Sequence, residues 1–131
     1  MLNETFRPKI LVVDDEEAIR DVFSEVLMRA GEYEVECAWD GYEAVQKAAR
    51  GNFELILMDI AMPGMDGLNT IKTMEIVCPG TPILVLSGYL TNKMIEEALR
   101  HGAAMALCKP VEPMLLLKTV EDILKDVMRE T

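Results

Sequence analysis

The stretch that decides the fold is Glu54-Leu-Ile-Leu-Met-Asp59-Ile-Ala-Met-Pro-Gly-Met-Asp-Gly67. Its apolar run, residues 55–58, has the length of a strand and ends at Asp59, and a turn rich in proline and glycine follows. A short, wholly apolar run bounded by turn signals is typical of a strand buried on both faces of a parallel sheet. Asp59 is therefore predicted at the carboxyl edge of such a sheet, where open α/β folds place their sites.

Five strand-like segments alternate with five helical patterns along the chain. We predict strands over residues 9–13, 34–39, 55–58, 82–86 and 104–108. Apolar residues recur at helical spacing after each strand, and capping signals such as Asp40 and Thr91 begin two of the helices. Strands that alternate with helices form a parallel sheet with right-handed crossovers and helices on both faces. We therefore predict a doubly wound, three-layer α/β fold.

The composition limits which partners the chain can bind. The chain has 131 residues, enough for one core and too few for two, and its formal net charge at pH 7 is −10. Nucleic acid and anionic membrane surfaces require a basic face, so we expect neither as a direct partner. No apolar run reaches the length of a membrane span and the N-terminus has no signal-peptide core, so we expect a cytoplasmic protein.

Several residues with reactive or bulky side chains have an ordinary structural interpretation. Cys37, Cys78 and Cys108 lie far apart without metal-ligand spacing, so we expect reduced, buried thiols. The single tryptophan, Trp39, is expected to pack at the end of the second strand, and Leu99 is expected to face the core from the helix that begins after Thr91.

Polar side chains with chemical potential follow four of the predicted strands. Asp14 and Asp15 follow the first strand, Asp59 the third, Ser87 the fourth and Lys109 the fifth. Any one of them could simply cap or turn the chain. In a parallel sheet, however, these strand ends share one edge, so three carboxylates, a hydroxyl and an ammonium are expected to converge there.

This set of groups suits phosphoryl transfer onto a carboxylate. Three carboxylates in a small site repel one another unless a cation compensates them, and Mg²⁺ binds carboxylates while keeping waters and a phosphate oxygen in its shell. Lys109 supplies a second positive charge and Ser87 a hydroxyl donor. In this arrangement Asp59 would be the nucleophile, with the cations neutralising the transferring group.

Four short motifs in this order resemble those of the receiver domain of a two-component response regulator, in a layout similar to the single-domain chemotaxis regulator. The matching stretches are Ile10-Leu-Val-Val-Asp14-Asp15, Leu57-Met-Asp59-Ile-Ala-Met-Pro63-Gly-Met-Asp-Gly67, Val85-Leu-Ser87-Gly and Cys108-Lys109-Pro110. They fall within residues 9 to about 128, nearly the whole chain. The resemblance implies a flavodoxin-like sandwich with five parallel strands in the order 2-1-3-4-5 and five helices on both faces.

The resemblance also implies roles for the acidic residues. Asp59 matches the phosphoacceptor, which a histidine kinase or phosphotransfer protein loads. Asp14 and Asp15 match the pair that holds Mg²⁺, with Asp59 and the backbone carbonyl of Ile60 completing the protein ligands. Such a domain is not a conventional enzyme, because it catalyses only its own phosphorylation and dephosphorylation.

The remaining matched positions concern the response to phosphorylation. Ser87 matches the switch hydroxyl, Lys109 the lysine that pairs with the phosphoryl group, and the Lys109–Pro110 bond one that is cis in the family. The position three residues before the lysine usually carries Tyr or Phe, whose ring swings inward, but here it is Ala106. We hypothesise that Tyr89, two residues after Ser87, shares the coupling.

We expect residues 1–8 to form a short leader and residues 9–129 the receiver domain. The resemblance implies output through the surface of the fourth helix, fifth strand and fifth helix, toward a downstream protein or a detached output domain. The mixed charges of those helices are compatible with a homodimer through this surface and equally with a solvated face.

Three other functions were weighed. A nucleotide- or flavin-binding domain needs a Gly- or Ser/Thr-rich loop after the first strand, where this chain has four acidic residues. A hydrolase of the haloacid dehalogenase type needs a second aspartate two residues after its nucleophile, and Asp14-Asp15 breaks that spacing. A pseudo-receiver that only binds proteins stays open at this point as the alternative to a phosphoacceptor.

Overall fold

The computed structural model of the chain describes residues 6–62 and 66–129, with side chains up to residue 126. The strands are β1 (Lys9–Val13), β2 (Glu34–Ala38), β3 (Leu55–Met58), β4 (Ile83–Ser87) and β5 (Ala103–Cys108). The helices are α1 (Glu17–Arg29), α2 (Gly41–Arg50), α3 (Gly67–Val77), α4 (Asn92–Arg100) and α5 (Pro113–Arg129). Strands and helices alternate throughout the described chain.

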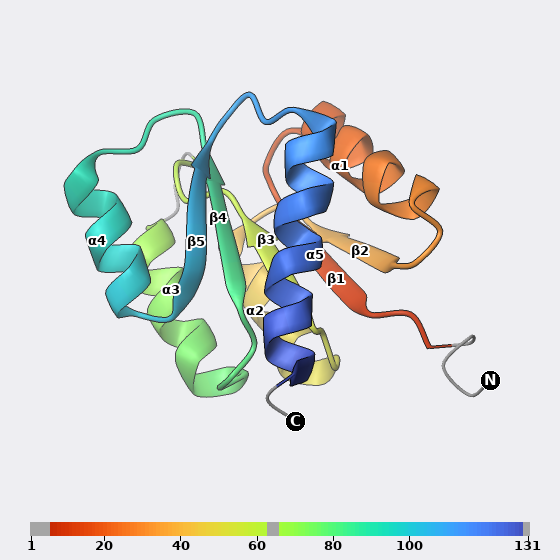
Figure 1. Cartoon of the computed structure of the whole chain (residues 1–131). Coiled ribbons are helices and arrows are strands. Elements are labelled where there is room, and N and C mark those ends of the chain that lie inside the picture. The colour runs from red at the N-terminus through yellow and green to blue at the C-terminus, as the bar shows by residue number, and fades with distance from the viewer. Residues whose placement is uncertain (1–5, 63–65, 130–131) are drawn as a thin grey trace.

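The five strands form one parallel sheet in the order β2-β1-β3-β4-β5. The chain enters the sheet at β1, moves outward to the edge strand β2, and then crosses back past β1 to β3 (Figure 1). The strand order therefore reverses between β1 and β3, and the crevice at their carboxyl ends is the place where open α/β sheets bind ligands.

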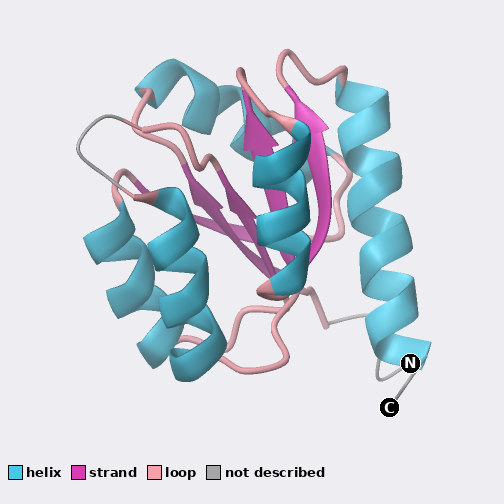
Figure 2. Ribbon diagram, turned by 90° about the vertical axis from the view of Figure 1, so that its left-hand side faces the viewer, coloured by secondary structure: helices cyan, strands magenta, loops and turns pink. Residues whose placement is uncertain are grey.

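Helices cover both faces of the sheet (Figures 1 and 2). Two apolar cores contain buried residues of the sheet and of these helices. On one face, Leu27 of α1 and Leu116 of α5 pack against residues such as Leu57 of β3. On the other, Ala44 of α2 and Ile71 of α3 join a second core cluster that extends to α4. Neighbouring residues of a strand point to opposite faces, and both faces are covered, so β1, β3 and β4 are apolar apart from Lys9 at the start of β1 and Ser87 at the end of β4.

The predicted fold class, strand order and edge position of the second strand are confirmed. Strand boundaries differ from the predictions by one residue, since β2 ends at Ala38, β4 runs over Ile83–Ser87 and β5 begins at Ala103. Residues 1–5 of the predicted leader lie outside the described residues, so that part of the prediction is untested. No described helix combines the length and apolarity needed to cross a membrane.

Three expectations about burial were wrong. Trp39 is 57% exposed because β2 ends one residue earlier, which leaves its side chain in the turn before α2. Cys108 is exposed because it ends β5, an edge strand whose outer side has no further strand beside it. The other two cysteines are partly buried, and all three are free thiols as expected. Leu99, expected to face the core from α4, is 46% exposed.

Candidate functional site

Backbone pairing beyond the strand ends sets the position of each candidate residue. The amide of Asp14 donates to the carbonyl of Ala38 (3.1 Å), so this residue continues the ladder between β1 and β2. The amide of Asp59 donates to the carbonyl of Val13 (3.1 Å) in the same way. The sheet therefore fixes both aspartates at adjacent strand ends, as the sequence predicts.

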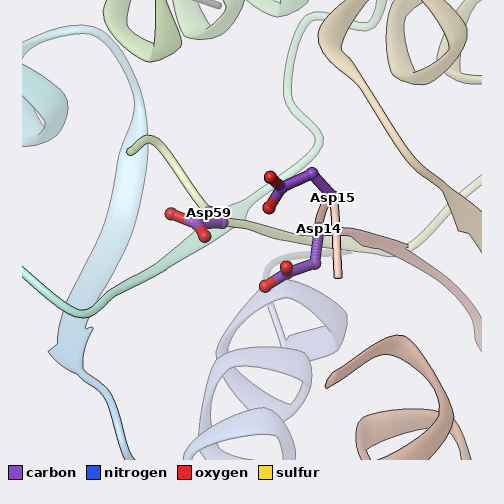
Figure 3. Close-up of side chains that lie close together, drawn as sticks. All are labelled: Asp14, Asp15 and Asp59. Carbon is purple, nitrogen blue, oxygen red and sulfur yellow. The ribbon is translucent and has the colours of Figure 1, made fainter. Parts of the chain in front are cut away.

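The three predicted carboxylates converge at this edge (Figure 3). Asp14, Asp15 and Asp59 each place an oxygen within 4.8 Å of the others. Asp14 and Asp59 are buried, at 1% and 7% exposure, whereas Asp15 is exposed. Solvent thus reaches the cluster mainly from the side of Asp15.

Lys109 joins the two buried carboxylates. Its Nζ donates to Asp14 Oδ2 at 2.6 Å and to Asp59 Oδ2 at 2.9 Å. Burial lowers the pKa of the Lys109 ammonium, but the hydrogen bonds and charges of both aspartates outweigh it, so that its pKa lies above the ordinary value. Lys109 is therefore a fixed cation, held at β5 because its own amide donates to the carbonyl of Ser87 at 2.8 Å.

Backbone amides orient the same carboxylates from their other oxygens. The amide of Glu16 donates to Asp14 Oδ1 (3.0 Å), and the amide of Ala61 donates to Asp59 Oδ1 (2.8 Å). Arg20 also contributes, since its Nη1 donates to the backbone carbonyl of Asp14 at 2.8 Å. Arg20 is not among the residues predicted for the site, although its place early in the helix after Asp14 was a usable signal.

The donor set fits a hard divalent cation. Lys109 compensates one of the three carboxylate charges, and the two that are left equal the charge of one divalent ion. Carboxylate oxygens with access to water are the ligands that Mg²⁺ prefers, and larger cages of protein ligands favour Ca²⁺. The acidic cluster can therefore hold a metal ion on the side of exposed Asp15.

A glycine shapes the chain beside the predicted carbonyl ligand. A Cβ added to Gly67 would lie 2.4 Å from Cβ of Ile60 and 2.5 Å from its Cα and carbonyl oxygen. Contacts that close do not occur in folded proteins, so only glycine lets α3 begin against the backbone of Ile60. The first turn of α3 and the backbone of Ile60 therefore hold each other in place.

Ser87 and Tyr89 lie at the same edge, and Ala106 lies two residues before the end of β5. The Ser87 carbonyl accepts from the Lys109 amide, but in the described structure none of these three side chains has a hydrogen bond to the carboxylates. Ser87 Oγ donates to the carbonyl of Tyr89 and accepts from its amide, both at 3.3 Å. Ala106 is partly buried and packs against the core cluster under α4, and Tyr89 is 71% exposed. The Lys109–Pro110 bond is cis, as the resemblance implies. We call Asp14, Asp15, Asp59 and Lys109 the acidic group, and Ser87, Gly88 and Tyr89 the switch group. Short hydrogen bonds from Lys109 join the acidic group, whereas the buried Ser87 hydroxyl of the switch group has only two long hydrogen bonds within the described structure.

Comparison with known proteins identifies the family. Residues 10–121 match the sequence model described as the response regulator receiver domain. The chain belongs to this family. The receiver domain is 32% identical over 118 residues to the chemotaxis protein CheY of Thermotoga maritima, which covers 89% of this chain and 98% of that protein. The resemblance found in the four motifs is therefore confirmed.

Solved structures and longer relatives agree with this assignment. A CheY-like receiver domain protein from Methanospirillum hungatei superposes with a TM-score of 0.92 at 32% identity, covering 96% of this chain and all of that one. An uncharacterized transcriptional regulatory protein of Bacillus subtilis, YesN, is 32% identical over 124 residues. The receiver domain spans 34% of YesN, so relatives include both single-domain and multidomain proteins.

Proposed function

We propose that the receiver domain accepts a phosphoryl group on Asp59 with Mg²⁺ bound at the acidic cluster. The observation that supports this most directly is the Lys109 ammonium, within hydrogen-bond distance of both Asp14 and Asp59 while Asp15 lies close by. A domain that only bound proteins would not need a buried carboxylate beside a fixed cation and a metal-binding group. No observation favours the pseudo-receiver alternative.

The proposed reaction transfers the group from a phosphohistidine of a histidine kinase or phosphotransfer protein. A carboxylate oxygen of Asp59 attacks phosphorus, the phosphorus–nitrogen bond breaks, and the imidazole leaves with the electron pair. Bound Mg²⁺, held by Asp14, Asp15, Asp59 and the Ile60 carbonyl, would supply neutralising charge for the phosphoryl oxygens. Because Asp59 is only 7% exposed, the donor must reach it from the open side of the cluster.

Lys109 and the backbone amide of Ala61 have complementary roles in this proposal. Both donate to Asp59, Lys109 at 2.9 Å and Ala61 at 2.8 Å, and so they hold the carboxylate in one orientation. Lys109 is near enough to pair with an incoming phosphoryl oxygen without a large movement of its backbone. The lysine therefore positions the nucleophile before transfer and neutralises charge during it.

The switch begins at Ser87 in our proposal. Its two contacts with the backbone of Tyr89 are 3.3 Å long, at the weak end for hydrogen bonds, so a turn of the hydroxyl toward the phosphoryl group costs little. That turn would release the backbone of Tyr89 in the loop before α4. Tyr89 would thereby carry the signal to the α4–β5–α5 surface that Ala106, without a ring, cannot carry in the usual way.

The proposed output is binding of a downstream protein or an output domain through the α4–β5–α5 surface. Leu99, Met105 and Leu115, one from each of these elements, are between 43% and 48% exposed. A homodimer through the same surface is a further form of this proposal. A cytoplasmic location, where kinases of this kind act, completes it.

Intact mass spectrometry after incubation with acetyl phosphate tests the proposal. We expect a gain of one phosphoryl group that requires Mg²⁺ and is lost in Asp59→Asn. Asp126→Asn, which removes an exposed carboxylate from α5, is the matched control and should react like the wild type. If the wild type gains no phosphoryl group at any Mg²⁺ concentration, or if Asp59→Asn gains one at the same rate, the proposal is wrong.

A further inference from the structure

A groove lies beside the acidic cluster and is not explained by phosphoryl transfer. It has a volume of about 600 Å³ and runs between the start of α2 and the first turns of α3. Asp15 of the acidic cluster is one of its lining residues, and Val45 and Met62 are apolar residues of its lining. This volume falls within the range of sites that bind a small ligand or a few residues of a peptide.

Two exposed aromatic rings line the groove. Trp39 is 57% exposed and Tyr42 is 74% exposed, although both are large and partly apolar. The Tyr42 hydroxyl accepts a hydrogen bond from Gln46 Nε2 at 3.0 Å, one turn further along α2, which restrains the ring. Neither ring contributes to a core cluster of the described structure. Exposure of two large rings to water is unfavourable, which points to contact with another molecule.

The groove is also negatively charged. Three carboxylates line it, from Asp15, Asp40 and Asp66, and none of the described residues that line it is basic. Asp40 Oδ1 accepts from the amide of Glu43 at 2.8 Å, and Asp66 Oδ1 accepts from the amide of Asn69 at 3.2 Å. These capping bonds fix two of the carboxylates at the groove. Each carries a full negative charge, which exceeds the half positive charge of the helix end it caps.

We infer that this groove binds an arginine-bearing segment of a partner protein. A guanidinium is planar, stacks on aromatic faces and pairs with carboxylates in a forked geometry, and all three features match the groove. The aliphatic part of the arginine side chain would lie along Val45, which is only partly buried. The net charge of −10 further favours a basic segment over an acidic or neutral one.

This inference does not depend on phosphorylation or on a bound metal. It can therefore be tested on the unphosphorylated receiver domain in EDTA, where failure says nothing about the chemistry of Asp59. Trp39 is the single tryptophan of the chain, so its fluorescence reports directly on the groove. The probe is a capped hexapeptide with four arginines. The same peptide with four citrullines keeps the shape of the side chains and removes the charge.

We expect the arginine peptide to change Trp39 fluorescence with an affinity at least about fivefold higher than that of the citrulline peptide at low salt. The double variant Asp40→Asn/Asp66→Asn should weaken binding roughly fivefold. Asparagine caps helices as well as aspartate does, so this variant removes charge and keeps α2 and α3. Tyr42→Ala should weaken binding about threefold through the lost ring.

The control double variant is Asp21→Asn/Asp126→Asn. It makes the same change in net charge on exposed positions of α1 and α5, which cover the opposite face of the sheet. It should bind the arginine peptide as the wild type does. Equal weakening of peptide binding by both double variants would overturn the inference, because the peptide would then respond to the net charge of the domain and not to the groove. The inference would also be overturned if the citrulline peptide or spermidine bound with the same affinity as the arginine peptide.

Discussion

The acidic group and the switch group lie at the same edge of the sheet but are built very differently. In the acidic group, Lys109 joins two carboxylates at 2.6 and 2.9 Å, and backbone amides hold their other oxygens. In the switch group, the Ser87 hydroxyl has, among the described residues, hydrogen bonds only with the backbone of Tyr89, both at 3.3 Å, and the tyrosine ring is exposed. Reacting groups need a fixed geometry and a switch needs two states of similar energy, so the difference follows the proposed division of labour.

The largest effect is expected from breaking the acidic group at Lys109. In Lys109→Met, the buried carboxylates of Asp14 and Asp59 would face each other without the cation, which should lower the free energy of unfolding by about 3 kcal/mol in EDTA. Added Mg²⁺ should restore part of this loss because it compensates the same charges. Urea unfolding with and without Mg²⁺ measures both effects.

Lys118→Met is the control for this prediction. Lys118 also pairs with an aspartate, Asp122, at 3.2 Å, but its side chain is 67% exposed. Exposed pairs of this kind contribute little, so we expect a change of at most about 0.5 kcal/mol. Equal stability of Lys109→Met and the wild type in EDTA would show that the acidic group is not held by this lysine.

Gly67 and Gly88 allow the backbone beside the acidic group to be compared with the backbone of the switch group. Gly67→Ala brings a Cβ to within 2.5 Å of the Ile60 backbone, and relieving that contact should cost about 2 kcal/mol and weaken Mg²⁺ binding through the displaced carbonyl. Gly88 belongs to the switch group, and a Cβ there meets nothing within 4 Å. We expect Gly88→Ala to change neither stability nor Mg²⁺ affinity appreciably.

Urea unfolding and a Mg²⁺ titration of both glycine variants measure this contrast. If Gly88→Ala destabilised the domain as much as Gly67→Ala, the backbone after β4 would be as tightly packed as the backbone after β3. The contrast between a fixed and a loosely held group would then be lost. A stable Gly67→Ala variant with normal Mg²⁺ affinity would instead remove Ile60 from the proposed ligands.

The sequence could predict the fold and the members of the site because both follow from strand ends. Unbroken apolar runs such as Leu55–Met58 are buried on both faces, so the residue after each run must lie at the sheet edge. Asp14, Asp59 and Lys109 could therefore be placed together from the sequence without any knowledge of their contacts. The matched motifs then supplied the strand order, which periodicity alone does not determine.

Side-chain partners and edge exposure could not be predicted in the same way. The hydrogen bonds of Lys109 with two carboxylates depend on its rotamer, which cannot be predicted from the spacing of residues in the sequence. Trp39 and Cys108 are apolar or weakly polar residues at the ends of edge strands, where a hydrophobic residue can lie in the open. A hydrophobic residue is buried only where another element packs over it, and that packing depends on the tertiary structure.

Tyr89→Ala is expected to have the smallest effect on stability. It is also the sharpest test of the switch group. The ring is 71% exposed, so the free energy of unfolding should change by less than about 0.5 kcal/mol. The variant should nevertheless reduce the shifts that acetyl phosphate and Mg²⁺ induce in the amide NMR signals of β5, because Ala106 has no ring to respond. Tyr42→Ala, which removes another exposed tyrosine (74%) from the far side of the site, should leave those shifts unchanged. Full shifts in Tyr89→Ala would mean that the signal reaches β5 without Tyr89, through Ser87 and Lys109 alone.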